Sequence, residues 1–156
     1  MSGIVIAEQC HVVNILPPVD ITGGATSDVF SMGNYSHATI IMQIGVSAAA
    51  FTKLIVEKCD NFTPSTHTDM AFAVYKEETT TGDTLGSRTA VAAAGLTPSD
   101  VDNTMYVIEI DAAELGSGYD KLRLEITNGV NSVIASAVAI LSGGRYVSES
   151  TPTVIS

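Results

Sequence analysis

The acidic residues between positions 100 and 111 are the first candidates for chemistry, because their spacing imitates a calcium-binding loop. Asp100, Asp102 and Thr104 occupy alternate positions, and Asp111 stands at the twelfth place of the imitation. Such a loop needs a glycine at its sixth place for a sharp turn, and Met105 stands there instead. We therefore expect no calcium site and interpret these carboxylates as solvated groups at a strand edge.

The histidines and cysteines are the other residues that could hold a metal. His11, His37 and His67 lie far apart and lack the paired spacing of zinc ligands. Cys10 and Cys59 form no CxxC motif, so we interpret them as two reduced, buried thiols rather than a disulfide. The sequence predicts no metal and no cofactor.

Three patterns bear on catalysis, and each departs from what its chemistry requires. Residues 45–49 lack the second glycine of a nucleophile elbow, and residues 82–87 lack the lysine and the glycine spacing of a phosphate-binding loop. Glu109 and Asp111 share a strand face, but glycosidases hold such a pair in an aromatic-lined cleft, and the chain has no tryptophan. We expect no catalytic residues and no enzyme.

The charge balance bears on the partners of the protein. The 156 residues include 17 acidic and 7 basic side chains, giving a net charge of -10, which repels phosphate backbones and anionic lipids. We expect neither nucleic acid nor a membrane as partner. Residues 1–10 lack the basic and apolar regions of a secretory signal, so synthesis in the cytoplasm of a host is expected.

Apolar and polar side chains alternate with the period of two that is typical of half-buried strands. In residues 119–127 this predicts an inward and an outward set, and we expect replacement of the outward Arg123 to cost little stability. The inward sets of three segments are Ile40, Met42, Ile44 and Val46; Tyr106, Ile108 and Ile110; and Leu122, Leu124 and Ile126. Further strands are predicted at residues 12–16, 28–32, 52–59, 70–76, 88–92 and 133–141.

Helix signals are limited to short turns in loops, at residues 90–95 and 111–115, the second with Asp111 as N-cap. Many short strands separated by Gly, Pro, Asn and Ser clusters favour a mostly-β, single-domain antiparallel sandwich or barrel. We divide the chain into an N-terminal arm with the first strand (1–20), a β domain (21–144) and an extended C-terminal tail (145–156).

Residues 133–141 are apolar on both faces of the predicted strand, so the face away from the core needs a cover. The long connection, a terminal tail and another subunit are all compatible with the sequence, and we interpret the pattern as a subunit interface. Both termini also carry apolar residues that are hard to bury in a small domain. The predicted interface residues are Ile4, Val5, Ile6, Val133, Ala135, Ala137, Ala139, Arg145, Tyr146, Val154 and Ile155.

Several segments are similar to those of the head decoration, or capsid-stabilising cement, proteins of tailed bacteriophages. These segments cover most of the chain: residues 12–20, 29–32, 35–41, 108–115, 119–124 and 139–146. The resemblance implies a jelly-roll-like β-sandwich without an active site, which binds the outside of the major capsid protein shell. It also implies contact with its own copies, as a trimer, and location in the virion.

Two other functions remain compatible with these observations. The protein could serve as an adaptor of the phage tail, neck or fibre attachment, which differs in copy number rather than in sequence pattern. A carbohydrate-binding sandwich is the third hypothesis, against which stands the absence of tryptophan, since sugars are usually met by exposed aromatic rings.

Overall fold

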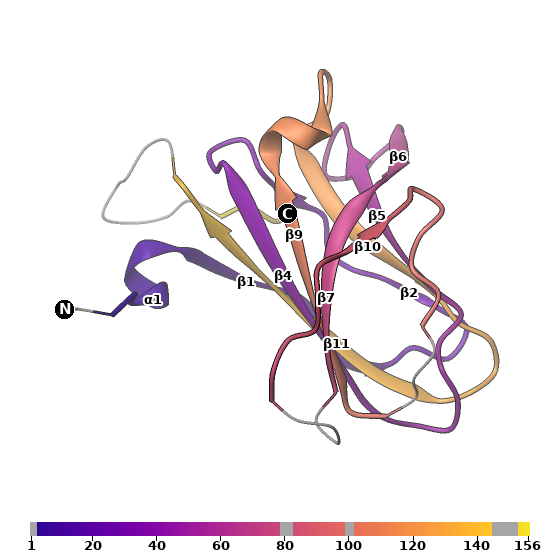
Figure 1. Cartoon of the computed structure of the whole chain (residues 1–156). Coiled ribbons are helices and arrows are strands. Elements are labelled where there is room, and N and C mark those ends of the chain that lie inside the picture. Colours follow the sequence, from indigo (N-terminus) through magenta and orange to yellow (C-terminus); the bar gives the residue numbers. More distant parts are fainter. Residues whose placement is uncertain (1–2, 79–82, 99–101, 145–152) are drawn as a thin grey trace.

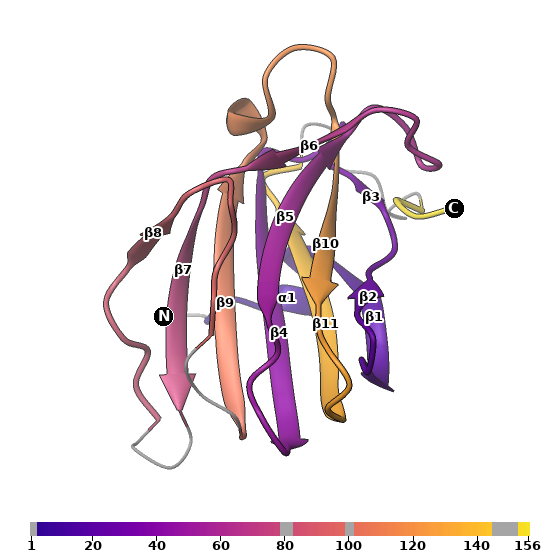
Figure 2. The same cartoon turned by 90° about the vertical axis from the view of Figure 1, so that its right-hand side faces the viewer.

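Alternating side chains fold this chain into two antiparallel sheets that face each other (Figure 1). The computed structural model describes residues 3–78, 83–98, 102–144 and 153–156. The six-stranded sheet has the order β1 (His11–Asp20), β11 (Val133–Ser142), β4 (His37–Ser47), β9 (Thr104–Asp111), β7 (Phe72–Glu78) and β8 (Thr89–Val91). The five-stranded sheet contains β2 (Ala25–Thr26), β10 (Lys121–Thr127), β5 (Lys53–Cys59) and β6 (His67–Met70), with β3 (Phe30–Ser31) also paired to β10. Figure 2 looks onto the five-stranded sheet, with the other behind it.

The pairing of the strands is nested along the sequence. β1 pairs with β11, β2 and β3 pair with β10, β4 pairs with β9, and β5 pairs with β6. Lateral pairing of β11 with β4 and of β10 with β5 rolls this long hairpin into two sheets. Such a rolled hairpin is the jelly-roll arrangement, with the β7–β8 hairpin added at one edge. The predicted jelly-roll-like sandwich is confirmed.

The core lies between the sheets and uses the predicted inward faces. Leu122, Leu124 and Ile126 on β10 are at most 1% exposed, and they face residues such as Ile40 and Ile108 of the other sheet, which are fully buried. The exception is Val46, which is 73% exposed. The register shifts in β11, where the two-residue step from Val133 to Ala135 lies opposite the three-residue step from Ser47 to Ile44 of β4. The extra residue reverses the alternation of β4 after Ile44.

The two predicted helical turns have different outcomes. The 3-10 helix Ala112–Leu115 forms, and the Asp111 backbone N–H donates to Glu114 Oε2 over 2.7 Å. Residues 90–95 instead form the end of β8 and a tight turn. Gly95 has a φ of +90°, and a Cβ there would lie 2.7 Å from the Leu54 carbonyl oxygen, so only glycine fits this position.

Candidate functional site

The outer face of the six-stranded sheet, pointing away from the core, carries a band of apolar side chains. The register places Val138 of β11, Ile41 of β4, Val107 of β9 and Tyr75 of β7 in one row across four strands. Beside this row, Val12 is 49% exposed and Ile134 is 41% exposed. We call these six residues the outer apolar band. An apolar sheet face of this kind is suited to contact with another protein.

The N-terminal segment lies beside this sheet and is held by few contacts. Ile4 is 80% exposed, and Val5 and Ile6 are each 45% exposed. The one-turn helix α1 (Ile6–Gln9) contains no buried residue and leads directly into the edge strand β1. In Figure 1 it stands at the side of the domain, beyond β1. These three predicted interface residues are therefore accessible to a partner.

The remaining predicted interface residues behave differently. Val133, Ala135, Ala137 and Ala139 are at most 1% exposed and belong to the core, so the prediction named the inward face of β11. The alternation places Ile134, Ser136, Val138 and Ile140 on the outer face instead, with Ile134 the most exposed of the apolar ones. The error arose because both faces of this strand are apolar, so that polarity gives no orientation.

The end of the chain packs on its own domain. Val154 is 4% exposed, and its carbonyl oxygen accepts a hydrogen bond from the Ser31 backbone N–H over 2.8 Å. Ile155 packs against the core beside it. These two residues, predicted as a free interface, therefore complete the core of their own subunit. Arg145 and Tyr146 lie outside the described residues.

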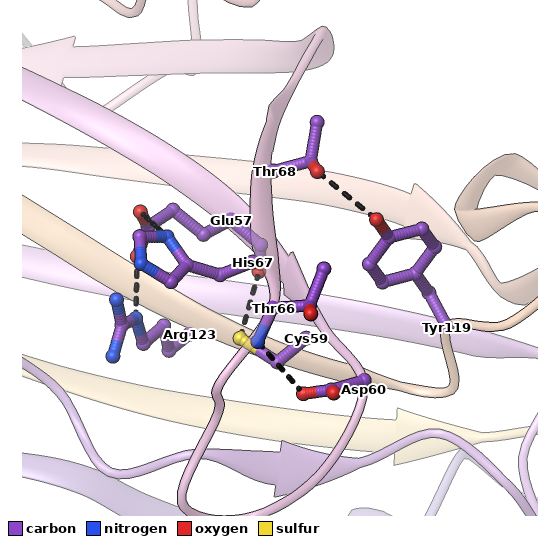
Figure 3. Close-up of polar contacts among 8 residues, drawn as sticks. All are labelled: Glu57, Cys59, Asp60, Thr66, His67, Thr68, Tyr119 and Arg123. Carbon is purple, nitrogen blue, oxygen red and sulfur yellow. Dashed lines mark hydrogen bonds and ion pairs between the residues drawn. The ribbon is translucent and has the colours of Figure 1, made fainter.

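On the outer face of the five-stranded sheet, Glu57 lies between His67 and Arg123 (Figure 3). Its side chain is buried, and the residue is 1% exposed. Its Oε1 accepts from His67 Nδ1 over 2.7 Å, and its Oε2 accepts from Arg123 Nε. Burial alone would raise the pKa of Glu57, but the hydrogen bond and charge of Arg123, followed by those of His67, lower it below its usual value. The three side chains therefore tie β5, β6 and β10 together as an ion-pair network.

Cys59 and Glu125 lie next to this network, and their pKa values indicate what chemistry is available there. Cys59 is fully buried, and burial raises the pKa of its thiol to about 11, so it remains a protonated thiol rather than a nucleophile. Glu125 has a raised pKa, first because of partial burial and then because of the negative charge of Glu57. Both cysteines are free. The network holds strands together and presents no activated nucleophile.

A second polar cluster lies on the outer face of the six-stranded sheet. His37 is placed between two carboxylates, with its Nδ1 2.7 Å from Asp111 Oδ1 and its Nε2 2.6 Å from Glu109 Oε2. Thr39 donates to the same Glu109 oxygen over 2.7 Å. Burial lowers the pKa of His37, but the hydrogen bonds and charges of Asp111 and Glu109 together raise it above its ordinary value. The predicted carboxylate pair is thus bridged by a histidine.

The candidate metal ligands are engaged within the protein. Asp102 Oδ1 accepts from the Ser47 backbone N–H over 2.6 Å, while Asp100 lies outside the described residues. Within the described ranges, no group of three or more His, Cys, Asp or Glu side chains is arranged to hold a metal ion. The helices in those ranges are also too short or too polar to cross a membrane.

Comparisons with known proteins give a likeness at the level of the fold. No family model and no curated protein matches the sequence. The fold is similar to the crystal structure of the SPBc2 prophage-derived protein YomS, with a TM-score of 0.46 and 15% sequence identity. The likeness covers 84% of this chain and 92% of that chain.

Sequence reasoning missed the polar networks for a specific reason. Strand alternation assigns Arg123 and Glu109 to outer faces, which is correct, but it does not show which strands are neighbours. Opposite charges on outward positions of candidate strands were the available signal. The partner of each charge followed only from the sheet order.

Proposed function

We propose that this protein is a non-catalytic structural component of a phage particle, which decorates the capsid by binding the outside of the major capsid protein shell. The observation that carries the proposal is the accessible N-terminal segment, where Ile4, Val5 and Ile6 are exposed next to an edge strand. Three exposed aliphatic residues in a short arm are suited to insertion into a groove of a neighbouring protein. The outer apolar band supplies a second contact surface beside this arm.

The segments that resemble decoration proteins support the same role. Residues 12–20 lie in β1, residues 108–115 include the end of β9 and the 3-10 helix, and residues 119–124 and 139–146 include parts of β10 and β11. These segments therefore lie along strands of both sheets and are not gathered around one cleft. A resemblance in such strands supports a shared architecture and a binding role, whereas related enzymes would be expected to share a cluster of side chains.

Polar chemistry in the described residues is also consistent with a structural role. Glu57 accepts hydrogen bonds from Arg123 and His67, and Glu109 accepts hydrogen bonds from His37 and Thr39. The net charge of -10 disfavours nucleic acid and anionic lipid as the partner. A protein surface of the capsid is the partner that we propose.

We further propose that the protein contacts its own copies, as a trimer seated on the shell. The arm leads into the edge strand β1, and its apolar residues are exposed. These features support contact between the arm of one copy and the outer apolar band of the next. The trimer itself comes from the resemblance, because shell proteins at threefold positions match that symmetry. Light scattering of the purified protein measures the oligomeric state.

The location and copy number of the protein in purified particles test the proposal. We expect many copies distributed over the shell, measured by quantitative mass spectrometry and immunogold labelling. A dozen copies or fewer at one vertex would replace the proposal by an adaptor of the tail, neck or fibre attachment. Absence from the particles would overturn both.

A further inference from the structure

A pocket of about 360 Å³ opens on the outer side of the six-stranded sheet, near the register shift of β4 and β11. The register places Ser136, Gln43, Met105 and Glu77 in one row across β11, β4, β9 and β7, and all four line the pocket. Ile134 forms another part of the wall. The volume is large enough for a long side chain of another protein.

Glu77 is the unusual residue of this pocket, because it is only 8% exposed and still lines the opening. No described residue donates a hydrogen bond to its carboxylate or forms an ion pair with it, in contrast to Glu57 on the other sheet. Among the described side chains no fully enclosed polar atom lacks a partner, so the Glu77 oxygens face the open space of the pocket. A largely buried carboxylate that no described residue pairs with is hydrated less well than an exposed one, so a cationic partner would stabilise it.

The pocket combines three kinds of group around this carboxylate. Ile134 and Met105 provide apolar wall, and Gln43 and Ser136 provide a side-chain amide and a hydroxyl. An aliphatic stem with a positively charged end matches this combination, since the stem packs on the wall while the end pairs with the carboxylate. Arginine and lysine side chains have this form.

We propose that this pocket receives an arginine or lysine side chain of a partner protein, with Glu77 as its counter-ion. The chain carries 17 acidic and 7 basic residues, so its field attracts a basic surface and brings such a side chain to the pocket. The proposal concerns the surface chemistry of the partner and holds whether that partner is in a shell, in a tail or elsewhere.

Binding of side-chain analogues to the full chain tests the pocket directly. The probes are n-butylguanidinium for arginine and n-butylammonium for lysine, with neutral 1-butanol as the uncharged control. We expect both cations to cause saturable NMR shifts at the Ile134 methyl groups and the Gln43 side-chain amide. The stronger of the two identifies the preferred residue. The alcohol is expected to cause much smaller shifts, because it cannot pair with the carboxylate.

Glu77→Gln keeps the shape of the side chain and removes its charge. We expect this variant to lose affinity for the cations by at least about tenfold, as for the loss of a charge-assisted hydrogen bond. Glu125→Gln, which removes a charge from the other sheet, is the matched control and should bind like the unaltered protein. Equal binding by Glu77→Gln, or no shift at Ile134 and Gln43, would overturn the proposal.

Stability gives a second readout that does not depend on finding the partner. Glu77→Gln should melt at the same temperature as the unaltered protein or higher, because it removes an unpaired carboxylate. The cations should raise the melting temperature of the unaltered protein and leave that of Glu77→Gln unchanged. A lower melting temperature for Glu77→Gln would show that the carboxylate already has a partner within its own chain, and would overturn the proposal.

Discussion

Arg123 on β10 donates its Nε–H to Oε2 of Glu57 on the adjacent strand β5, where Glu57 is 1% exposed. The two residues stand directly opposite each other in the antiparallel register. His67 of β6 holds the other carboxylate oxygen over 2.7 Å. Three neighbouring strands are thus joined by one carboxylate, on the face of the sheet that points away from the core.

Replacing Arg123 by alanine should therefore be costly, although strand alternation alone predicts a harmless change. We expect Arg123→Ala to lower the free energy of unfolding by about 3 kcal/mol, because it leaves the buried carboxylate of Glu57 with His67 as its remaining partner. Arg88→Ala is the matched control, since Arg88 is exposed, and should change stability by less than about 0.5 kcal/mol. Urea unfolding of both variants measures the difference. Equal stabilities would show that water replaces the guanidinium at Glu57.

His37 should make stability depend on pH. Its pKa is raised in the folded state, so the protonated form is favoured by folding. The resulting stabilisation is fully present below the unfolded pKa of about 6.5 and is lost as the pH rises through the folded pKa. We expect the stability difference between the unaltered protein and His37→Gln to be larger at pH 6 than at pH 9, measured by denaturant unfolding. A difference independent of pH would contradict this assignment.

Asp20 should have the opposite pH dependence. Hydrogen bonds from Ser132, from the Thr22 hydroxyl and from the Thr22 N–H lower its pKa to about 2. The stabilisation is therefore present above the unfolded pKa of 3.8 and is lost as the pH falls toward 2. We expect Asp20→Ala to weaken the protein at pH 6 and to match it near pH 2. An NMR titration with a midpoint near 4 for Asp20 would argue against these bonds.

The two termini should respond differently to deletion. Residues 3–9 are all exposed, so deleting residues 1–9 should leave the melting temperature unchanged while weakening attachment to the particle. Deleting residues 153–156 removes the buried Val154 and its bond to Ser31, and should cost about 2 kcal/mol. Calorimetry and particle-binding assays on both variants separate these effects. Unchanged attachment without the arm would count against the proposed docking role.

Local pattern was sufficient to predict which residues of several strands face the core. Leu124 and Ile108 follow strict alternation, and the structure buries both completely. Val46 was predicted to face the core, and this was wrong because a register shift depends on the partner strand and leaves no local signal. The burial of Val154 was not predicted, because it depends on a contact with another element, here β3, that the local pattern does not show.

The sequence indicated which polar residues share a strand face, but not which residues they contact. Glu109 and Asp111 were recognised as a same-face pair, but His37, which lies 72 and 74 residues away in the sequence, holds both. The same holds for Glu57 and Arg123, which are 66 residues apart. Contacts of this range depend on the sheet order, which alternation does not contain.

The nested pairing of the strands also constrains the order in which the protein can form during synthesis. β11 lies between β1 and β4, and β10 lies between β5 and the short strands β2 and β3, so neither sheet closes until the last of these segments has left the ribosome. Before then, β1, β4 and β5 have unpaired edges that invite association with other chains. The growing polypeptide must therefore delay folding, and a nascent chain that stops before Lys121 should be cleaved rapidly by proteases, whereas the full chain resists.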